Sequence, residues 1–287
     1  ARPSTDAKTQ AANFAAQIAL APDQTLPPAL DIEVDEGKSA AQLEQWIEEF
    51  TSELKRLTGR TPMIYTYKYF WMGQMNNSQK FSDMPLWLAA YQDQAPEAVG
   101  GWKKLSFWQR SGSGKVAGIP TDVDMNLFNG SKQQLQSFSD GNYVDVGGAL
   151  EQLVVGDGVD LSSDSTPLIG AILALAAGLI AIPQLADAAE KSGLDPQAAQ
   201  GLAGFVKTLQ DKDALPVEDL GDMAKGNFSV GDLAILLDNA GHVNNVKSGN
   251  VSESEVSEAK NAAKKAGADV PDFDAGQVAT LLNRVLQ

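Results

Sequence analysis

Two carboxylic acids stand two residues apart at the end of an apolar run, in the segment Ala-Leu-Asp-Ile-Glu-Val at residues 29–34. Successive side chains of a strand alternate between its faces, so we expect Asp31 and Glu33 on one face and Ile32 on the other. Two carboxyl groups held this close cannot both ionise freely, and the pKa of one of them should rise. Such a pair is what glycoside hydrolysis requires. The alternative is a strand end with two solvated acids, a common outcome for so short a motif.

The composition narrows the chemistry that the chain can perform. Its 287 residues include no cysteine and one histidine, His242, which stands in a polar, turn-like segment and is expected to be solvated. Ser-His-Asp and Cys-His catalysis, and zinc sites built on Cys and His, therefore lack their residues. The glycine-rich segment 112–118 matches neither a phosphate-binding nor a dinucleotide-binding motif. Carboxylates must then carry any catalysis, and we expect neither a metal nor an organic cofactor.

Charge divides the chain into two parts. Residues 1–138 hold 13 of the 22 basic and 15 of the 37 acidic side chains, so most of the net charge of -15 falls in residues 139–287. All five tryptophans fall in the first part. The segment from Ser137 to Asn142 has the composition of a linker. We therefore predict two domains, 1–138 and 139–287. The acidic second domain would repel phosphate backbones, so nucleic acid is not expected as a partner.

The elements that would position the acids alternate along the first part. A helix is expected over residues 5–18 and another over 39–57, where Ser39 and Gln42 form a capping box and Gly59 supplies a stop. Apolar segments typical of strands occupy residues 29–34, 62–67, 85–91 and 105–109. Strands separated by helices or long loops favour a parallel sheet whose chemistry lies at the carboxyl ends of the strands.

Polar and aromatic side chains gather near those strand ends. Tyr65, Tyr91 and Gln109 lie toward the ends of their segments, as the paired acids do. A tight hairpin then leads into a further short strand, which is expected to present Asp122 and Asp124 on one face. The common position of these side chains predicts a single site.

Five motifs, taken in order, resemble a known family. They are the segment at 29–34 and the segments Pro-Met-Ile-Tyr-Thr-Tyr, Pro-Leu-Trp-Leu-Ala-Ala-Tyr, Phe-Trp-Gln-Arg-Ser-Gly-Ser-Gly-Lys-Val-Ala-Gly-Ile and Val-Asp-Met-Asn-Leu-Phe. Over residues 1–138 their order and spacing resemble glycoside hydrolase family 25, the lysozymes or N-acetylmuramidases of bacteria, fungi and bacteriophages. The resemblance implies an α/β fold, a modified β/α barrel, that cleaves the β-1,4 bond between N-acetylmuramic acid and N-acetylglucosamine in peptidoglycan.

The resemblance also implies roles for individual residues. Glu33 matches the proton donor, Asp31 the acid beside it, and Asp124 the acid on the last strand. Four side chains would line the sugar cleft, where amphipathic rings stack on sugar faces; they are Tyr65, Trp87, Tyr91 and Gln109. Whether water or the substrate's own acetamido group attacks is left open. A carboxyl separation of about 5 to 5.5 Å would suit a covalent nucleophile, and about 6.5 to 9.5 Å would leave room for water.

The chain departs from the family pattern at its amino end. The family begins with a strand that carries another active-site Asp and continues with two more strands, which have no counterpart here. Residues 1–138 would then supply about five of the eight barrel strands. Three interpretations stand: a second polypeptide completes the barrel, the sequence is part of a longer chain, or the fold has been put to a non-catalytic use.

Residues 139–287 match no motif that we can assign, and we expect an acidic, all-α domain. A hydrophobic helix is predicted over residues 166–186, inside a stretch without charge that is long enough to span a membrane. It lacks flanking Lys or Arg and aromatic anchors, so a buried central helix and a segment in contact with a membrane both remain open. Further helices are expected over residues 196–210, 229–239, 252–267 and 274–286.

Two functions are consistent with these patterns. The first is peptidoglycan hydrolysis by a domain that the region 139–287 anchors or positions through a protein partner or an oligomer. A phage particle or contractile injection machine would suit that architecture, and the expected location is extracellular, at the cell wall or on a virion. The alternative is a structural or wall-binding component that retains a partial barrel without catalysis.

Overall fold

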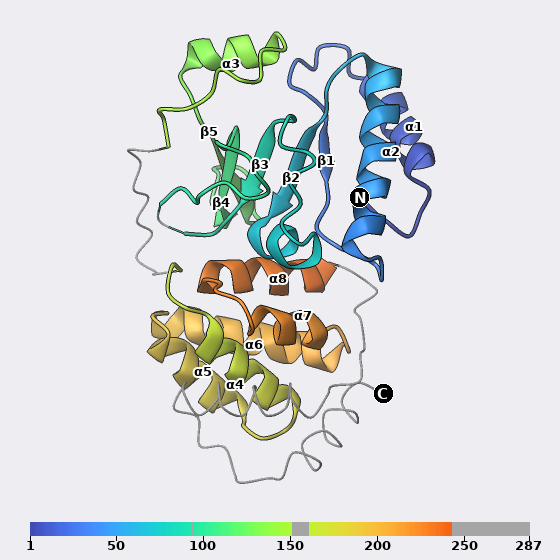
Figure 1. Cartoon of the computed structure of the whole chain (residues 1–287). Coiled ribbons are helices and arrows are strands. Elements are labelled where there is room, and N and C mark those ends of the chain that lie inside the picture. The colour runs from blue at the N-terminus through green and yellow to red at the C-terminus, as the bar shows by residue number, and fades with distance from the viewer. Residues whose placement is uncertain (93, 151–160, 243–287) are drawn as a thin grey trace. The chain divides into compact units, whose positions relative to one another are not determined.

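The computed structural model describes residues 1–92, 94–150 and 161–242 (Figure 1). By its internal contacts the chain divides into two compact units, Ala1–Val155 and Gly156–Gln287. The described part of the first unit combines a sheet with helices, and that of the second contains five helices. The predicted succession of an α/β part and an all-α part is thus confirmed.

A five-stranded sheet forms the centre of the first unit. Its strands follow one another in space as they do in the chain. The first four are parallel and the fifth is antiparallel to the fourth, so the carboxyl ends of four strands meet at one edge. The strands are β1 (Ala29–Asp31), β2 (Met63–Tyr67), β3 (Leu86–Ala89), β4 (Phe107–Gly114) and β5 (Val123–Phe128).

The register of the sheet decides which side chains meet. Asp31, Tyr65, Trp87 and Phe107 form one row across the four parallel strands. Because alternate residues of a strand share a face, Gln109 lies on the face of Phe107. The other face carries fully buried apolar side chains, among them Leu30, Ile64, Leu88 and Trp108. The sheet therefore has one apolar face and one face with polar and aromatic groups, which we call the polar face.

Two helices lie against each other and beside β1, namely α1 (Ala7–Ala19) and α2 (Ala40–Thr58) (Figure 1). The predicted capping box of α2 is confirmed, and Gly59 ends this helix in the left-handed conformation, with a φ of 72°. The apolar stripe of α2 is buried; it consists of Leu43, Trp46, Ile47, Phe50 and Leu54. The indole of Trp46 also donates a hydrogen bond to the carbonyl of Thr5, 2.8 Å away, which ties the start of the chain to α2.

The end of the first unit packs on its sheet. Helix α3 (Lys132–Ser139) begins at a capping box of Ser131 and Gln134. Its Phe138 is fully buried in a cluster with Met63 and Val146. The compact unit accordingly extends to Val155, beyond the boundary at residue 138 that the sequence suggests. The reason is that the side chains after α3 supply part of the core.

The second unit, in its described residues, is built from α4 (Thr166–Ala176), α5 (Ile182–Lys191), α6 (Pro196–Asp211), α7 (Val217–Met223) and α8 (Val230–His242). Ser229 and Asp232 cap the start of α8 reciprocally, at 2.9 and 3.2 Å. Ser165 donates to the carbonyl of Phe228, which joins the start of α4 to the loop before α8. The helices predicted over 196–210 and 229–239 are confirmed, whereas 252–267 and 274–286 lie outside the described residues.

The single hydrophobic helix predicted over residues 166–186 is wrong. The segment forms two helices, because Gly178 adopts a φ of 70° and the amide of Leu179 turns back to the carbonyl of Ala174 at 2.8 Å. Every residue from Leu168 to Ala176 is buried. Among the described residues, we find no helix with both the length and the apolar character needed to cross a membrane.

Candidate functional site

The paired acids lie at the carboxyl end of β1. Asp31 is the last residue of that strand, and its side chain is 60 % exposed. Ile32 is fully buried and continues the pairing with β2, its amide donating to the carbonyl of Tyr65 at 3.0 Å. Glu33 is half-buried. The expected alternation is therefore present, with an apolar side chain in the core between two acids outside it.

Tyr65 lies beside the paired acids, opposite Asp31 in the register of β1 and β2. Burial raises the pKa of its hydroxyl strongly, and the negative charges of Glu33, Asp31 and Asp124 add to the shift. The hydroxyl is therefore protonated at neutral pH. It donates a hydrogen bond to Oε1 of Gln109 at 2.9 Å.

Gln109 joins two tyrosines at the centre of the polar face. It is only 4 % exposed, and its Oε1 also accepts a hydrogen bond from the hydroxyl of Tyr91 at 3.4 Å. A Cβ added to Gly112 would lie 2.5 Å from that hydroxyl, so the glycine leaves room for the ring of Tyr91. The phenols of Tyr65, in β2, and of Tyr91, which follows β3, are thus held by one buried amide.

Trp87 supplies an aromatic surface beside this network. Its ring meets Tyr65 edge to face, with ring centroids 5.0 Å apart. Its indole nitrogen donates to Oδ1 of Asn126 at 2.8 Å. On β5, Asp124 and Asn126 are both exposed and share a face, because they are two residues apart.

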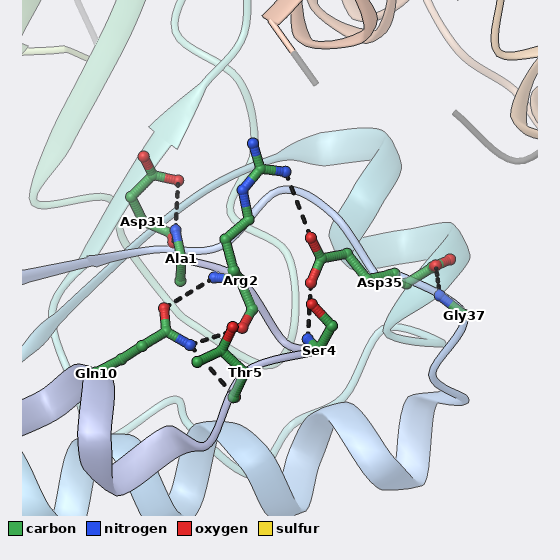
Figure 2. Close-up of polar contacts among 9 residues, drawn as sticks. Ala1, Arg2, Ser4, Thr5, Gln10, Asp31, Asp35 and Gly37 are labelled. Carbon is green, nitrogen blue, oxygen red and sulfur yellow. Dashed lines mark hydrogen bonds and ion pairs between the residues drawn. The ribbon is translucent and has the colours of Figure 1, made fainter. Parts of the chain in front are cut away.

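The amino-terminal segment folds against the same end of β1, as Figure 2 shows. The amino group of Ala1 donates to the carbonyl of Asp31 at 2.7 Å and lies 4.0 Å from its Oδ1. Partial burial alone would raise the pKa of Glu36, but hydrogen bonds from Ser4 and the charge of Arg2 outweigh it and hold that pKa below its usual value. The contacts of Arg2 and Ser4 with Glu36 thus hold the turn that follows Glu33.

The structure brings most of the predicted site residues to the polar face. Asp31, Glu33 and Asp124 all act on Tyr65, and the four predicted cleft residues contact one another in sequence, from Trp87 through Tyr65 and Gln109 to Tyr91. Asp122 does not join them. It precedes β5 and forms an ion pair with Lys115 in the hairpin.

Asn126 belongs to this site and was not predicted from the sequence. The signal that could have found it is its spacing of two from Asp124 in a strand, which puts both side chains on one face. It is an amide rather than an acid, so it carries no proton-transfer chemistry that would distinguish it in the sequence.

The arrangement suits acid–base chemistry on a sugar. It offers several carboxyl groups, a tyrosine that remains protonated, and an aromatic ring on which a pyranose face can stack. In the described ranges, no cluster of three or more His, Cys, Asp or Glu side chains is placed to hold a metal ion.

Comparisons with known proteins give a consistent picture. The family model described as "Glycosyl hydrolases family 25" matches residues 1–119. An uncharacterized protein of Escherichia coli, YegX, is 34 % identical over 140 residues, 48 % of this chain and 49 % of its own length. Lysozyme M1 of Streptomyces globisporus is 37 % identical over 122 residues, 39 % of this chain and 41 % of its own.

Among solved structures, the chain is similar to a bacterial lysozyme of Streptomyces coelicolor. The TM-score is 0.44 and the identity 29 %, over 49 % of this chain and 69 % of that one. The chain spans about half the length of the curated relatives that it matches. All of these matches cover less than half of this chain.

Proposed function

Residues 1–119 belong to the glycosyl hydrolases of family 25, and from this membership we propose that the chain hydrolyses peptidoglycan. The bond to be cleaved is the β-1,4 bond between N-acetylmuramic acid and N-acetylglucosamine. The observation that carries the proposal is the row of Asp31, Tyr65 and Trp87 across β1 to β3, with the hydroxyl of Tyr65 bonded to the buried Gln109. The relatives include a lysozyme and an N,O-diacetylmuramidase, which supports the same substrate class.

In the proposed reaction, Glu33 gives its proton to the glycosidic oxygen as the bond from that oxygen to the anomeric carbon breaks. Positive charge develops on the sugar ring, and the carboxylates of Asp31 and Asp124 stabilise it. The oxygen of a water molecule ends on the anomeric carbon, and a proton from that water restores the acid form of the enzyme. Direct attack by water and attack through the substrate's acetamido oxygen both fit this set of carboxylates.

The remaining site residues are proposed to bind the glycan. Trp87 would stack on the apolar face of a sugar ring. Tyr65 and Tyr91 direct their hydroxyl protons to Gln109, so the lone pairs on the phenol oxygens can accept hydrogen bonds from sugar O–H or amide N–H groups. Gln109 would act by holding both phenols in this orientation.

We assign a separate task to the second unit. An acidic helical unit that is compact by itself suits a module that docks a protein partner and positions the hydrolase at a cell wall, as in a phage particle or injection machine. The apolar side chains of α4 are used in the unit's own core. A fluorescent fusion of residues 156–287 that fails to label walls or particles, where the whole chain labels them, would contradict this assignment.

The test of catalysis is the substitution Glu33→Gln, which keeps the size of the side chain and removes its proton donor. We expect release of reducing ends from purified peptidoglycan to fall at least about 100-fold, the usual scale for a lost general acid. Glu53→Gln is a matched control, because Glu53 lies on α2 and pairs with Arg56 at 2.6 Å. It should leave the rate within about twofold, since an exposed ion pair contributes little to stability.

The same preparation separates catalysis from binding alone. A chain that sediments with peptidoglycan but releases no reducing ends, whether or not Glu33 is replaced, would be a wall-binding component and would refute the hydrolase. Equal rates for the parent and Glu33→Gln would show that another group donates the proton.

A further inference from the structure

We propose that Asn126 is a positioning residue that fixes the orientation of the Trp87 indole and, through it, the affinity for the sugar that stacks on this ring. The inference rests on the proposed function for its ligand, a β-1,4-linked glycan of N-acetylated sugars. The orientation of Trp87 by Asn126 does not depend on that function, because it is inferred from the hydrogen bond between the two side chains.

The indole of Trp87 reaches over a neighbouring strand. Trp87 belongs to β3 and Asn126 to β5, and β4 lies between them. In the register of the sheet, Trp87 is opposite Phe107, whereas Asn126 is opposite Gln109, two residues further along β4. A hydrogen bond of 2.8 Å from the indole to Asn126 therefore draws the ring diagonally across β4, toward the end of the sheet where the acids lie.

The aromatic neighbours of Trp87 pack against its ring but do not determine which edge of the indole faces β5. Tyr65 meets the ring at an interplanar angle of 76°, and Phe107 lies at a centroid distance of 5.8 Å. Contacts of this kind are satisfied by either edge of an indole, because they depend on ring faces and edges rather than on one donor. The hydrogen bond to Asn126 distinguishes the edge that carries the N–H group.

Asn126 is itself oriented by the strand that carries Asp124. Its Nδ2 lies 3.4 Å from the carbonyl of Asp124, which leaves Oδ1 directed to the indole. The stacking ring is thus tied to the backbone of a proposed catalytic acid. A sugar that rests on Trp87 would be held at a set position relative to Asp124.

A double-mutant cycle tests this role in a Glu33→Gln background, where turnover does not interfere with binding. The ligand is a soluble N-acetylglucosamine oligomer, and its dissociation constant is measured by calorimetry. We expect Asn126→Ala to weaken binding about three- to tenfold, the effect of one lost hydrogen bond. Asn126→Asp retains an acceptor and should stay within about twofold of the parent. In Trp87→Phe, which has no indole N–H, adding Asn126→Ala should have no further effect.

An equal loss from Asn126→Ala with and without the Trp87→Phe substitution would overturn the proposal, because Asn126 would then contact the sugar directly. The ¹⁵N-labelled indole signals give a second readout that needs no ligand. We expect the Trp87 signal to move and to exchange faster with water in Asn126→Ala but not in the control Asn142→Ala, an exposed asparagine of the same unit. If the Trp87 signal does not change in Asn126→Ala, Asn126 does not orient the indole and the proposal is wrong. A parent that binds no glycan, with the signal still moved in Asn126→Ala, refutes the proposed function instead.

Discussion

At the scale of single residues, the hydroxyl of Tyr65 is the most informative group in the first unit. Burial raises its pKa, and three nearby carboxylates raise it further, so the neutral phenol is the form that the fold selects. An unfolded chain has no such preference, and there the phenol ionises near its ordinary value of 10.0. The raised pKa therefore makes the free energy of unfolding depend on pH, because the folded chain keeps a proton that the unfolded chain can lose.

The sign of the effect follows from proton counting. Below pH 10 the phenol is protonated in both states, and its contribution to stability is fully present. Above pH 10 the unfolded state loses the proton while the folded state keeps it, so stability falls as the pH rises. We expect Tyr65→Phe to be about 1 kcal/mol less stable than the parent at pH 8, through the lost hydrogen bond to Gln109, and to lose less stability than the parent between pH 10 and 11.

Urea unfolding followed by tryptophan fluorescence measures this difference, because all five tryptophans lie in residues 1–138. Parallel stability curves for the parent and Tyr65→Phe across this pH range would show that folding does not raise the pKa of this phenol.

Residue spacing predicted part of the site and could not predict the rest. The i, i+2 rule placed Asp31 and Glu33 on one side of Ile32 because a strand imposes that alternation whatever packs on it. It could not show that Gln109 is buried beneath two phenols, since that depends on which strands neighbour β4. Asn126 depends on the same cross-strand register, which brings Trp87 within reach from two strands away.

At the scale of elements, α2 is linked to the connection between β2 and β3. A short π-helix, η1 (Phe70–Gln74), follows β2, and the chain beyond it returns to α2. There Glu44 accepts a hydrogen bond of 2.5 Å from Ser78 and pairs with Lys80 at 2.7 Å. These polar contacts hold the connection against a helix that packs through its apolar stripe.

We expect Glu44→Gln to weaken this link in a pH-dependent way. The contacts with Lys80 and Ser78 lower the pKa of Glu44 below 4.5, so its stabilising effect is present above that pH and disappears as the pH falls. At pH 7 the variant should be about 1 kcal/mol less stable than the parent. Below pH 4 the difference should shrink.

Thermal unfolding from pH 3 to 7 checks this, with Glu49→Gln on the same helix as the control for loss of a negative charge. A constant difference between Glu44→Gln and the parent at all pH values would show that the ion pair is not its cause.

The sequence predicted whether a segment is helical better than it predicted where a helix is interrupted. The capping box of α2 and the stop at Gly59 are local signals, and both predicted the helix that forms. In the second unit, composition indicated one apolar helix over 166–186, but the positive φ of Gly178 ends α4 and the chain turns into α5. Glycine permits that turn without requiring it, so the sequence alone could not distinguish a break from a continuous helix.

At the scale of the whole molecule, the composition change at residue 138 and the edge of the compact unit at Val155 are different boundaries. Charge and linker-like sequence identify where acidic composition begins, whereas the core depends on which side chains pack. Tyr143 meets Phe138 edge to face at 5.0 Å, and Val146 and Leu150 are nearly buried. The segment after α3 is also bonded to the sheet, as the amide of Gly147 donates to the carbonyl of Asn129 at 2.7 Å.

Two truncated chains, 1–138 and 1–155, separate these boundaries. The shorter chain lacks Tyr143 and Val146, two of the side chains that cover Phe138, and should be less stable by about 3 kcal/mol or more, the order expected when two apolar side chains lose their burial. Tryptophan fluorescence during urea unfolding measures both chains with the same probe. Replacing Val146 with Ala in 1–155 should reproduce part of the loss, which would assign it to packing rather than to chain length. Equal stability of 1–138 and 1–155 would instead show that the folding unit ends where the composition changes. The segment after α3 would then be a linker that contributes nothing to the stability of the core.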